Sequence, residues 1–284
     1  MSETSKTFGI CGAGTMGVGI AYAASAAGFQ VVLYDLKDEV LSKAVETISK
    51  FVAKGVERGK LSEETGEELK GRISTSTDLG HMNGASIVVE AIIERLEIKQ
   101  ELFCNLEEVL DSQAIIATNT SSIAVTEMAN GLKHPERVVG MHFFNPAHIM
   151  KLVEVIKGYA TSEEIMQKTV DLALELRKTP VRVKDTPGFI VNRVARNFYG
   201  EAFRIVGEGA ATYDQIDRCL KSIGFRMGPF ELMDLIGVDV NFLVTESVYG
   251  EYFDEARFRP HLIQKKMVES GRVGIKAGGG FYES

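Results

Sequence analysis

Three glycines near the start of the chain have the spacing of a turn that binds a dinucleotide. Gly12, Gly14 and Gly17 follow the apolar stretch KTFGIC and precede the run Val18–Ala27, in which apolar residues recur at helical spacing. In such a strand–turn–helix unit the first glycine permits a tight turn, the second lets a pyrophosphate approach the backbone, and the third lets the helix pack closely on the sheet. The phosphates would face the N-terminus of a helix, which favours negative charge.

The residues around this turn indicate which dinucleotide it binds. Thr15 and Met16 lie between the second and third glycines, where backbone N–H groups face the phosphates. Asp35 ends the next strand-like stretch, QVVLYD, where its carboxylate can accept hydrogen bonds from the adenine ribose hydroxyls and would repel a 2′-phosphate. The order strand, glycine turn, helix, strand and acid therefore predicts NAD rather than NADP, with FAD as the main alternative for the same pattern.

One histidine stands where a nicotinamide-dependent reaction needs an acid–base group. Hydride transfer at an alcohol carbon also moves a proton, and histidine titrates in a range that serves both directions. His142 lies at the end of the strand-like stretch RVVGMHF, and Glu154 stands inside the apolar run KLVEVI, where an ionisable group is costly unless it is paired. The carboxylate could orient the imidazole and stabilise its protonated form. On spacing alone the alternative stays open that His142 is a hydrogen-bonded core residue and Glu154 faces water from an edge strand.

The elements that must position these residues read as a parallel sheet covered by helices. Short β-branched apolar stretches alternate with helix-period segments up to about Val183, which predicts an α/β domain with a Rossmann-type, doubly wound, mainly parallel sheet. Residues 37–71, too long for an ordinary connection, read as an inserted pair of helices broken near residues 55–61. The strand candidates are KTFGIC, QVVLYD, RIST, ASIVVEA, AIIATN, RVVGMHF, KLVEVI and PVRVK.

The strand pattern stops after Asp185, and the rest of the chain reads as an all-helical domain. We therefore expect an NAD-binding domain over residues 1–185 and a helical substrate and dimerisation domain over residues 186–284. Thr212 with Gln215 resembles a capping box, and Pro229 suits a first helical position. The tail GIKAGGGFYES is expected to lack regular structure. The helices are expected over Phe189–Glu208, Thr212–Ile223, Pro229–Ile236, Val240–Tyr249 and Pro260–Ser270.

The composition excludes several classes of partner. A formal net charge of −7 argues against nucleic acid or an anionic membrane, since either would need a broad basic surface. The N-terminal stretch lacks a basic region, and glycines interrupt its apolar runs, so neither a signal peptide nor a transmembrane span is expected. Cys11, Cys104 and Cys219 are widely separated, without spacing for a metal or a redox pair. Reduced thiols in the cytoplasm are the simplest interpretation.

Six ordered blocks of sequence resemble the L-3-hydroxyacyl-CoA dehydrogenase family, including its bacterial 3-hydroxybutyryl-CoA dehydrogenases. The blocks are GICGAGTMG, VVEAIIERLEIKQELF, TNTSSI, HFFNPAHIMKLVEVI, DTPGFIVNR and MGPFELMDLIG, and they cover nearly the whole chain in order. The resemblance implies an NAD-dependent enzyme that interconverts 3-hydroxyacyl and 3-oxoacyl thioesters of CoA. It also implies that His142 is the acid–base group and Glu154 its carboxylate partner.

The same resemblance assigns further residues that spacing does not. Ser121 corresponds to a serine that hydrogen-bonds the reacting oxygen, and Asn192 to an active-site asparagine from the helical domain. Glu94, Lys99 and Asn119 correspond to positions near the nicotinamide end of the cofactor. Without the resemblance, Ser121 or Ser122 would be the N-cap of a helix over residues 123–129, with Ser122 better placed, and Asn192 would be a polar residue facing water. Lys99 would be a solvated lysine and Glu94 a helix-start carboxylate.

The resemblance also gives the insertion and the helical domain a role. Lys54 and Arg58, four residues apart on one helix face, are implied to bind the CoA phosphates, although such a pair is more often a solvated helix face. The apolar content of the helical domain suggests a homodimer. Two alternatives remain open: a dehydrogenase of a free hydroxy acid, against which the insertion argues, and a non-catalytic NAD-binding structural protein, against which the four candidate catalytic residues argue.

Overall fold

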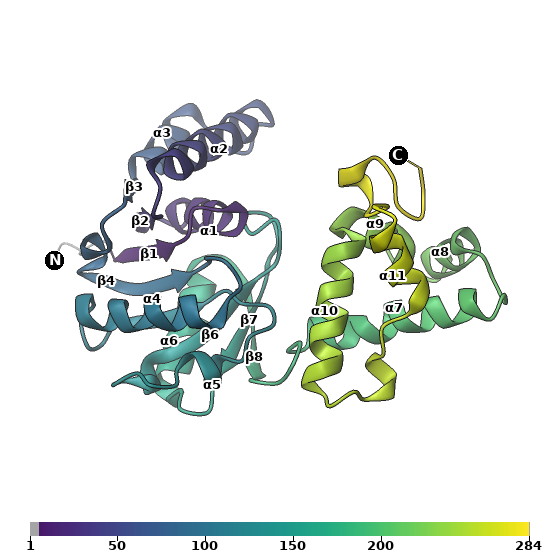
Figure 1. Ribbon diagram of the computed structural model, residues 1–284. Coiled ribbons are helices and arrows are strands. Elements are labelled where there is room, and N and C mark those ends of the chain that lie inside the picture. Colours follow the sequence, from purple (N-terminus) through teal and green to yellow (C-terminus); the bar gives the residue numbers. More distant parts are fainter. Residues whose placement is uncertain (1–5, 284) are drawn as a thin grey trace. The chain divides into compact units, whose positions relative to one another are not determined.

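The structure is a computed structural model that describes residues 6–283. The chain divides into two compact units, the first ending at Asp185 and the second beginning at Thr186 (Figure 1). No helix among the described residues is long and apolar enough to cross a membrane.

The first unit is built on one sheet of eight strands in the order β3-β2-β1-β4-β5-β6-β7-β8. Neighbouring strands are parallel except β6 and β7, so β7 and β8 run opposite to the other six. The strands are β1 (Thr7–Cys11), β2 (Gln30–Tyr34), β3 (Ile73–Ser76), β4 (Ala85–Glu90), β5 (Ile115–Thr118), β6 (Val138–Phe143), β7 (Leu152–Lys157) and β8 (Thr179–Lys184). All eight predicted strands are present, and the Rossmann-type prediction is confirmed.

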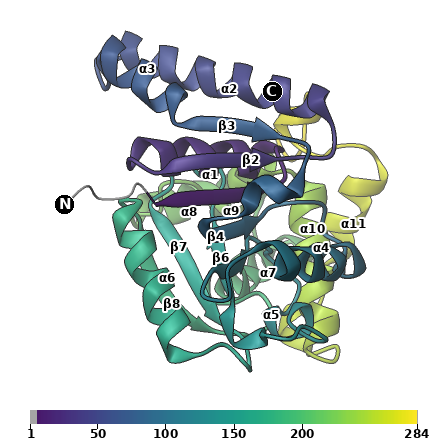
Figure 2. The same cartoon turned by 90° about the vertical axis from the view of Figure 1, so that its left-hand side faces the viewer.

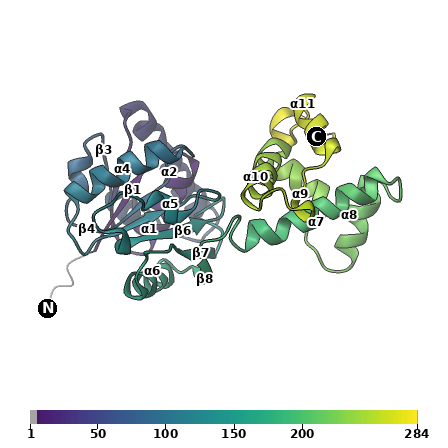
Figure 3. The same cartoon turned by 60° about the horizontal axis from the view of Figure 1, so that its bottom comes forward.

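Helices cover both faces of this sheet, which explains why its central strands are apolar at nearly every position. In Figure 3, α4 (Leu96–Val109) and α6 (Glu163–Glu175) lie on opposite sides of the strands. Side chains of α1 (Thr15–Ala26) and α6 share one hydrophobic cluster with alternate residues of the central strands. The remaining helical segments of the unit are α5 (Val125–Met128), η1 (Leu79–Met82) and η2 (Pro135–Arg137).

The predicted insertion is a pair of helices, α2 (Asp38–Glu57) and α3 (Glu63–Gly71). The buried residues of α2 are Leu41, Ala44, Ile48 and Val52, whose spacing places them on one face. That face packs towards α1 and α3, and Figure 2 shows both insertion helices beside the β3 edge of the sheet. The opposite face of α2 is left to solvent.

The second unit consists of helices around an aromatic core that includes Phe203, Phe230 and Phe281. The capping box of Thr212 with Gln215 is confirmed, and Pro229 occupies a first helical turn as predicted. Phe189 has a positive φ of 49°, so the first helix begins two residues later than predicted. The elements are α7 (Val191–Gly207), α8 (Tyr213–Ser222), α9 (Pro229–Ile236), α10 (Val238–Glu251), η3 (Ala256–Phe258), α11 (Leu262–Glu269) and η4 (Ile275–Ala277).

The glycine-rich tail is held in place, although it has little regular structure. The carboxylate of Asp234 accepts hydrogen bonds from the backbone N–H groups of Phe281 and Tyr282, each at 2.9 Å. The Tyr282 hydroxyl donates to the buried carboxylate of Asp217 at 2.8 Å. A Cβ on Gly280 would lie 1.9 Å from Asp234, so glycine is required where the tail passes this carboxylate.

Candidate active site

The glycine turn after β1 has the geometry that a pyrophosphate site needs. Gly12 has a φ of +105°, and a Cβ there would lie 2.5 Å from the Ala91 carbonyl oxygen. A Cβ on Gly17 would lie 1.8 Å from the carbonyl oxygen of Gly12, so only glycine lets α1 approach the turn. A Cβ on Gly14, in contrast, would have no heavy atom within 4 Å, which leaves open space above the backbone for a ligand. The three positions therefore meet the steric requirements of a tight turn, an open backbone and close packing of the helix.

The charged and polar groups around the turn also fit a dinucleotide. Gly14 is the N-cap of α1 and supplies no side-chain cap, so the first N–H groups of the helix, including those of Thr15 and Met16, can serve an anion. Asp35 follows β2, and its Oδ2 accepts a hydrogen bond from the Ala13 N–H at 2.9 Å. This bond fixes the Asp35 carboxylate beside the turn, where its other oxygen can accept from a ribose hydroxyl. The residues present thus fit NAD.

His142 and Glu154 form a buried pair on adjacent strands. They are direct partners in the antiparallel register of β6 and β7, and the His142 Nδ1 lies 2.8 Å from the Glu154 Oε2. The exposed fraction is 6% for His142 and 1% for Glu154. The alternative of a water-facing glutamate on an edge strand is therefore wrong, because β8 continues the sheet beyond β7 and covers that edge.

The pair lies at the carboxyl end of the parallel strands, where the glycine turn also lies. His142 is the second-last residue of β6. Because the strands are parallel, the same side of the sheet holds the C-terminal ends of β1, β2, β4, β5 and β6. Asn119, just after β5, connects the ends of three strands: its N–H donates to the Glu90 carbonyl oxygen at 2.8 Å, and its Oδ1 accepts from the Phe143 N–H at 2.9 Å. The turn that carries Ser121 is thereby attached to the strand that carries His142.

The turn after β5 differs from the prediction in how it is capped. Neither Ser121 nor Ser122 caps α5, which starts only at Val125. The Asp185 carboxylate, at the end of β8, accepts instead from the N–H groups of Val125 at 3.1 Å and Thr126 at 2.7 Å. This partner is distant in sequence, and the local pattern could not reveal it. Ser121 is half-buried in the turn and is not used as a cap.

Lys99 is buried rather than solvated, which corrects the interpretation from sequence alone. It is 1% exposed, and its Nζ lies 2.7 Å from Glu90 Oε1 and 2.8 Å from Glu94 Oε2. Burial alone would raise the pKa of Glu94, but the charge of Lys99 and hydrogen bonds from Lys99, Thr120 and Ser122 outweigh it, so the pKa is lowered. Sequence reasoning missed Glu90, although an acid inside the apolar run ASIVVEA is the same signal that pointed to Glu154.

The remaining predicted residues lie in separate places. Lys54 in α2 and Arg58 at its C-cap are both exposed, and neither is ion-paired with a carboxylate among the described residues. Asn192 belongs to the second unit, at the start of α7, and its carbonyl oxygen accepts a hydrogen bond from the buried Arg196 Nε.

Of the histidines expected at the surface, His81 and His134 are exposed, whereas His261 is half-buried. The His261 ring stacks against Phe203, and its Nδ1 caps α11.

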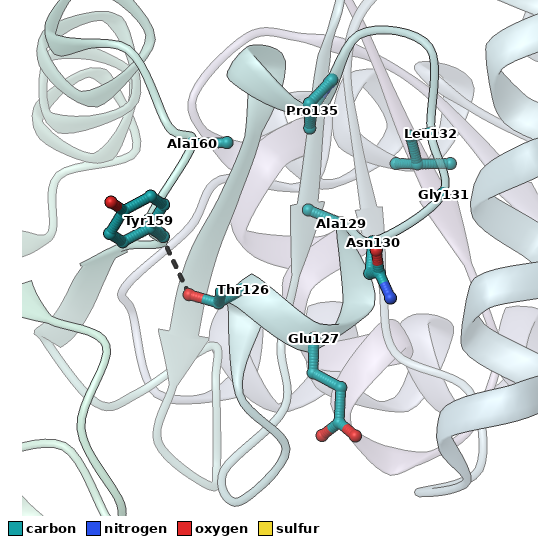
Figure 4. A pocket seen from close by; sticks show the side chains of 9 residues that line it. All are labelled: Thr126, Glu127, Ala129, Asn130, Gly131, Leu132, Pro135, Tyr159 and Ala160. Carbon is teal, nitrogen blue, oxygen red and sulfur yellow. Dashed lines mark hydrogen bonds between the residues drawn. The ribbon is translucent and has the colours of Figure 1, made fainter.

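A shallow pocket of about 390 Å³ in the first unit does not coincide with this site. Residues at the end of α5 and in the loops around Pro135 and Tyr159 line it, and the Tyr159 N–H donates to the Thr126 hydroxyl (Figure 4). These loops lie where β6 begins and β7 ends, at the opposite end of the strands from His142. The pocket is therefore remote from both the histidine and the glycine turn.

A glycine turn, an acid at the end of the second strand and a buried histidine–carboxylate pair, all at the carboxyl ends of the parallel strands of a Rossmann sheet, are typical of a nicotinamide-dependent dehydrogenase. Two family models match nearly the whole chain: the NAD-binding domain of 3-hydroxyacyl-CoA dehydrogenase over residues 7–186 and the C-terminal domain of the same enzyme over residues 188–284. The chain belongs to the 3-hydroxyacyl-CoA dehydrogenase family.

Several relatives within this family match over almost all of the chain. It is 48% identical to the 3-hydroxyadipyl-CoA dehydrogenase of Escherichia coli over 98% of its length, although it spans only 59% of that protein. It is 41% identical to a probable 3-hydroxybutyryl-CoA dehydrogenase of Deinococcus radiodurans, covering 97% of this chain and 99% of the relative. The crystal structure of (S)-3-hydroxybutyryl-CoA dehydrogenase from Ralstonia eutropha matches with a TM-score of 0.94 at 37% identity, covering 99% of each chain.

Proposed function

We propose that the protein interconverts a (3S)-3-hydroxyacyl-CoA and the corresponding 3-oxoacyl-CoA with NAD(H), with 3-hydroxybutyryl-CoA and acetoacetyl-CoA as its substrate pair. The observation that carries the proposal is the buried His142–Glu154 pair, which lies at the same carboxyl ends of the strands as the glycine turn. Residues 1–185 would bind the cofactor, and residues 186–284 would contribute to substrate binding and dimerisation.

His142 would act as the acid–base group. In the reducing direction its imidazolium donates a proton to the substrate oxygen, and in the oxidising direction its neutral ring accepts that proton. Nδ1 faces Glu154, and we assign Nε2 to the substrate. Ser121 and Asn192 would hydrogen-bond the oxygen while its charge develops. NAD, when bound, supplies the hydride acceptor and its reduced form the donor.

The cofactor would be held by residues along the carboxyl ends of the same strands. The N–H groups of the turn from Gly12 to Gly17 would bind the pyrophosphate, and Asp35 the adenine ribose. Glu94 and Asn119, further along the edge, would contact the nicotinamide half. Lys99 is buried beneath Glu94, so we now assign it an indirect role through that carboxylate.

Asp35→Asn is expected to lower the preference for NADH over NADPH by about tenfold, because it removes a negative charge that repels the 2′-phosphate. The amide oxygen can still accept from the Ala13 N–H, so the turn is retained. The ratio of kcat/KM for NADH to that for NADPH measures the effect. Asp38→Asn, an exposed change of equal charge at the start of α2, is the matched control. An unchanged ratio in Asp35→Asn would remove this residue from cofactor selection.

Lys54 and Arg58 would bind the phosphates of CoA, since an acidic protein needs a local basic patch for an anionic thioester. Replacing both with alanine is expected to raise KM for acetoacetyl-CoA by about tenfold with little change in kcat, because the lost contacts are far from the reacting carbon. The steady-state rates of Lys43→Ala, an exposed change on the same helix, provide the control. Acetoacetyl-N-acetylcysteamine lacks the nucleotide, and its KM should not change; an equal rise for both thioesters would contradict the assignment.

We further propose that the protein is a cytoplasmic homodimer that associates through the helical unit. Large apolar side chains remain exposed there, including Val194, Ile223 and Leu243, each more than 60% exposed. A groove lined by Phe198, Ile205 and Leu220 adds to this apolar surface. Sedimentation equilibrium should then give twice the 31.1 kDa mass of one chain. A monomer at micromolar concentration would contradict the proposal.

The decisive experiment is a spectrophotometric assay of NADH oxidation with 3-oxoacyl-CoA substrates of increasing length. It includes 3-oxoadipyl-CoA, because a relative at 48% identity is named for the dicarboxylic substrate. Acetoacetyl-CoA is expected to be reduced, and free CoA to compete with it. If free acetoacetate is reduced as fast and CoA does not compete, the protein is a hydroxy-acid dehydrogenase instead.

A further inference from the structure

The Glu90 carboxylate at the end of β4 is fully buried and fully hydrogen-bonded. It accepts from the Lys99 Nζ at 2.7 and 2.9 Å, from the Thr118 hydroxyl at 2.7 Å and from the Ile92 N–H at 2.7 Å. These four hydrogen bonds, from three donor groups, hold the carboxylate at a fixed place below the surface. It takes no part in the proposed proton transfer at His142.

Glu90, Lys99 and Glu94 together form a charge trio with one net negative charge. The buried Lys99 ammonium lies between the two carboxylates. Glu90 and Lys99 are both buried, whereas the Glu94 side chain is 40% exposed. The excess negative charge of the trio is therefore presented to solvent, or to a ligand, at Glu94.

The trio lies along the path that a bound dinucleotide must follow. Glu90 is the register partner of Cys11, the last residue before the glycine turn, and Gly12 packs against Ala91. On the other side, Glu94 accepts hydrogen bonds from Thr120 and Ser122, which flank Ser121, and Asn119 leads on to β6. The ends of β4 and β5 thus lie between the turn and His142. A dinucleotide with its ribose at Asp35 and its pyrophosphate at the turn must place its other ring here to react next to His142.

The nicotinamide ring carries a positive charge when oxidised and none when reduced. A negative charge beside the ring therefore stabilises one redox form of the cofactor and leaves the other nearly unaffected. We propose that Glu90, Lys99 and Glu94 set the relative affinity of this protein for NAD⁺ and NADH. Glu94 supplies the negative charge beside the ring, and the charge of Glu90 compensates the positive charge of Lys99 beneath it. This inference rests on the proposed function, because it needs a nicotinamide at the ends of β4 and β5.

Two variants test the charge balance. Glu94→Gln keeps an acceptor for Thr120 and Lys99 but leaves the trio neutral, so the Kd for NAD⁺ is expected to rise about fivefold while that for NADH stays within about twofold. Glu90→Gln also leaves the trio neutral, because the charge of Lys99 is then balanced only by Glu94. Its Kd for NAD⁺ should rise relative to NADH in the same direction. A purely structural role for the trio would weaken both cofactors equally.

The measurement is isothermal titration of the full-length protein with NAD⁺ and with NADH, without a thioester substrate. Glu97→Gln, an exposed change in the first turn of α4, is the control of equal charge and should leave both affinities unchanged. An unchanged ratio of the two Kd values in Glu94→Gln overturns the inference, and this partly exposed position keeps the test valid if Glu90→Gln does not fold. A wild-type protein that binds neither cofactor would instead contradict the proposed function, so the two failures are distinguishable.

Discussion

Replacing His142 with glutamine is expected to lower kcat for the reduction of acetoacetyl-CoA by roughly a thousandfold, as is typical when a general acid–base group is removed. Glutamine has a similar size and can still hydrogen-bond Glu154, but it cannot donate a proton and recover it within the cycle. Because the ring is only 6% exposed, solvent is poorly placed to replace it. Single-turnover reduction followed at 340 nm measures the chemical step directly.

The affinity of His142→Gln for NADH should stay within about twofold of the wild type, because the glycine turn and Asp35 remain intact. His134→Gln, an exposed histidine replaced in the same way, should keep the full rate. A His142→Gln protein that folds, binds NADH and retains the wild-type rate would refute the role of His142. Loss of rate together with loss of NADH binding would indicate misfolding instead, and thermal unfolding would reveal it.

The fold was predictable because its signals are local. Each central strand is a short apolar run, and such runs indicate strands buried on both faces whatever their order in the sheet. The capping box at Thr212 and the glycine turn are likewise complete within a few residues. The order of the strands is a different matter, because it depends on long-range pairing. Only the structure shows that β7 runs antiparallel to β6 and so places Glu154 opposite His142.

Beyond the glycine turn and Asp35, the charged residues of the candidate site were predictable only where a residue contradicts its surroundings. Glu154 was found because an acid in an apolar strand needs a partner, and Glu90 sends the same signal in an earlier strand. The sequence around Lys99 gives no such indication, because a lysine on a helix with mixed charges has the pattern of a solvated residue. Its burial depends on two carboxylates from outside its helix. The cap of α5 by Asp185 was hidden for the same reason, since the two are 60 residues apart in sequence.

Two groups of ionisable side chains at the carboxyl ends of the strands would serve the proposed function in different ways. Around His142 the carboxylate faces an imidazole that, under the proposed function, would gain and lose a proton in every turnover. Around Lys99 the two carboxylates face an ammonium that takes no part in the proposed proton transfer. The first pair can serve proton transfer, whereas the second can only provide a constant field. Substitutions at Glu154 and at Glu90 should therefore differ in kind, with the first changing kcat and the second changing relative cofactor affinity.

Glu154→Gln is expected to lower kcat by roughly 10- to 100-fold, the loss of one charge-assisted hydrogen bond in a buried site. Glutamine can still accept the hydrogen bond from Nδ1, so it keeps the ring oriented and removes only the charge that balances the imidazolium. Glu154→Asp keeps the charge on a shorter side chain and should recover part of the rate. The sharpest readout is the double variant. If Glu154 acts only through His142, then Glu154→Gln should cost almost nothing further in the His142→Gln background, because the positive ring that it stabilised is gone. Equal losses in both backgrounds would show that Glu154 acts independently of the imidazole, and the proton-transfer role of the pair would have to be abandoned.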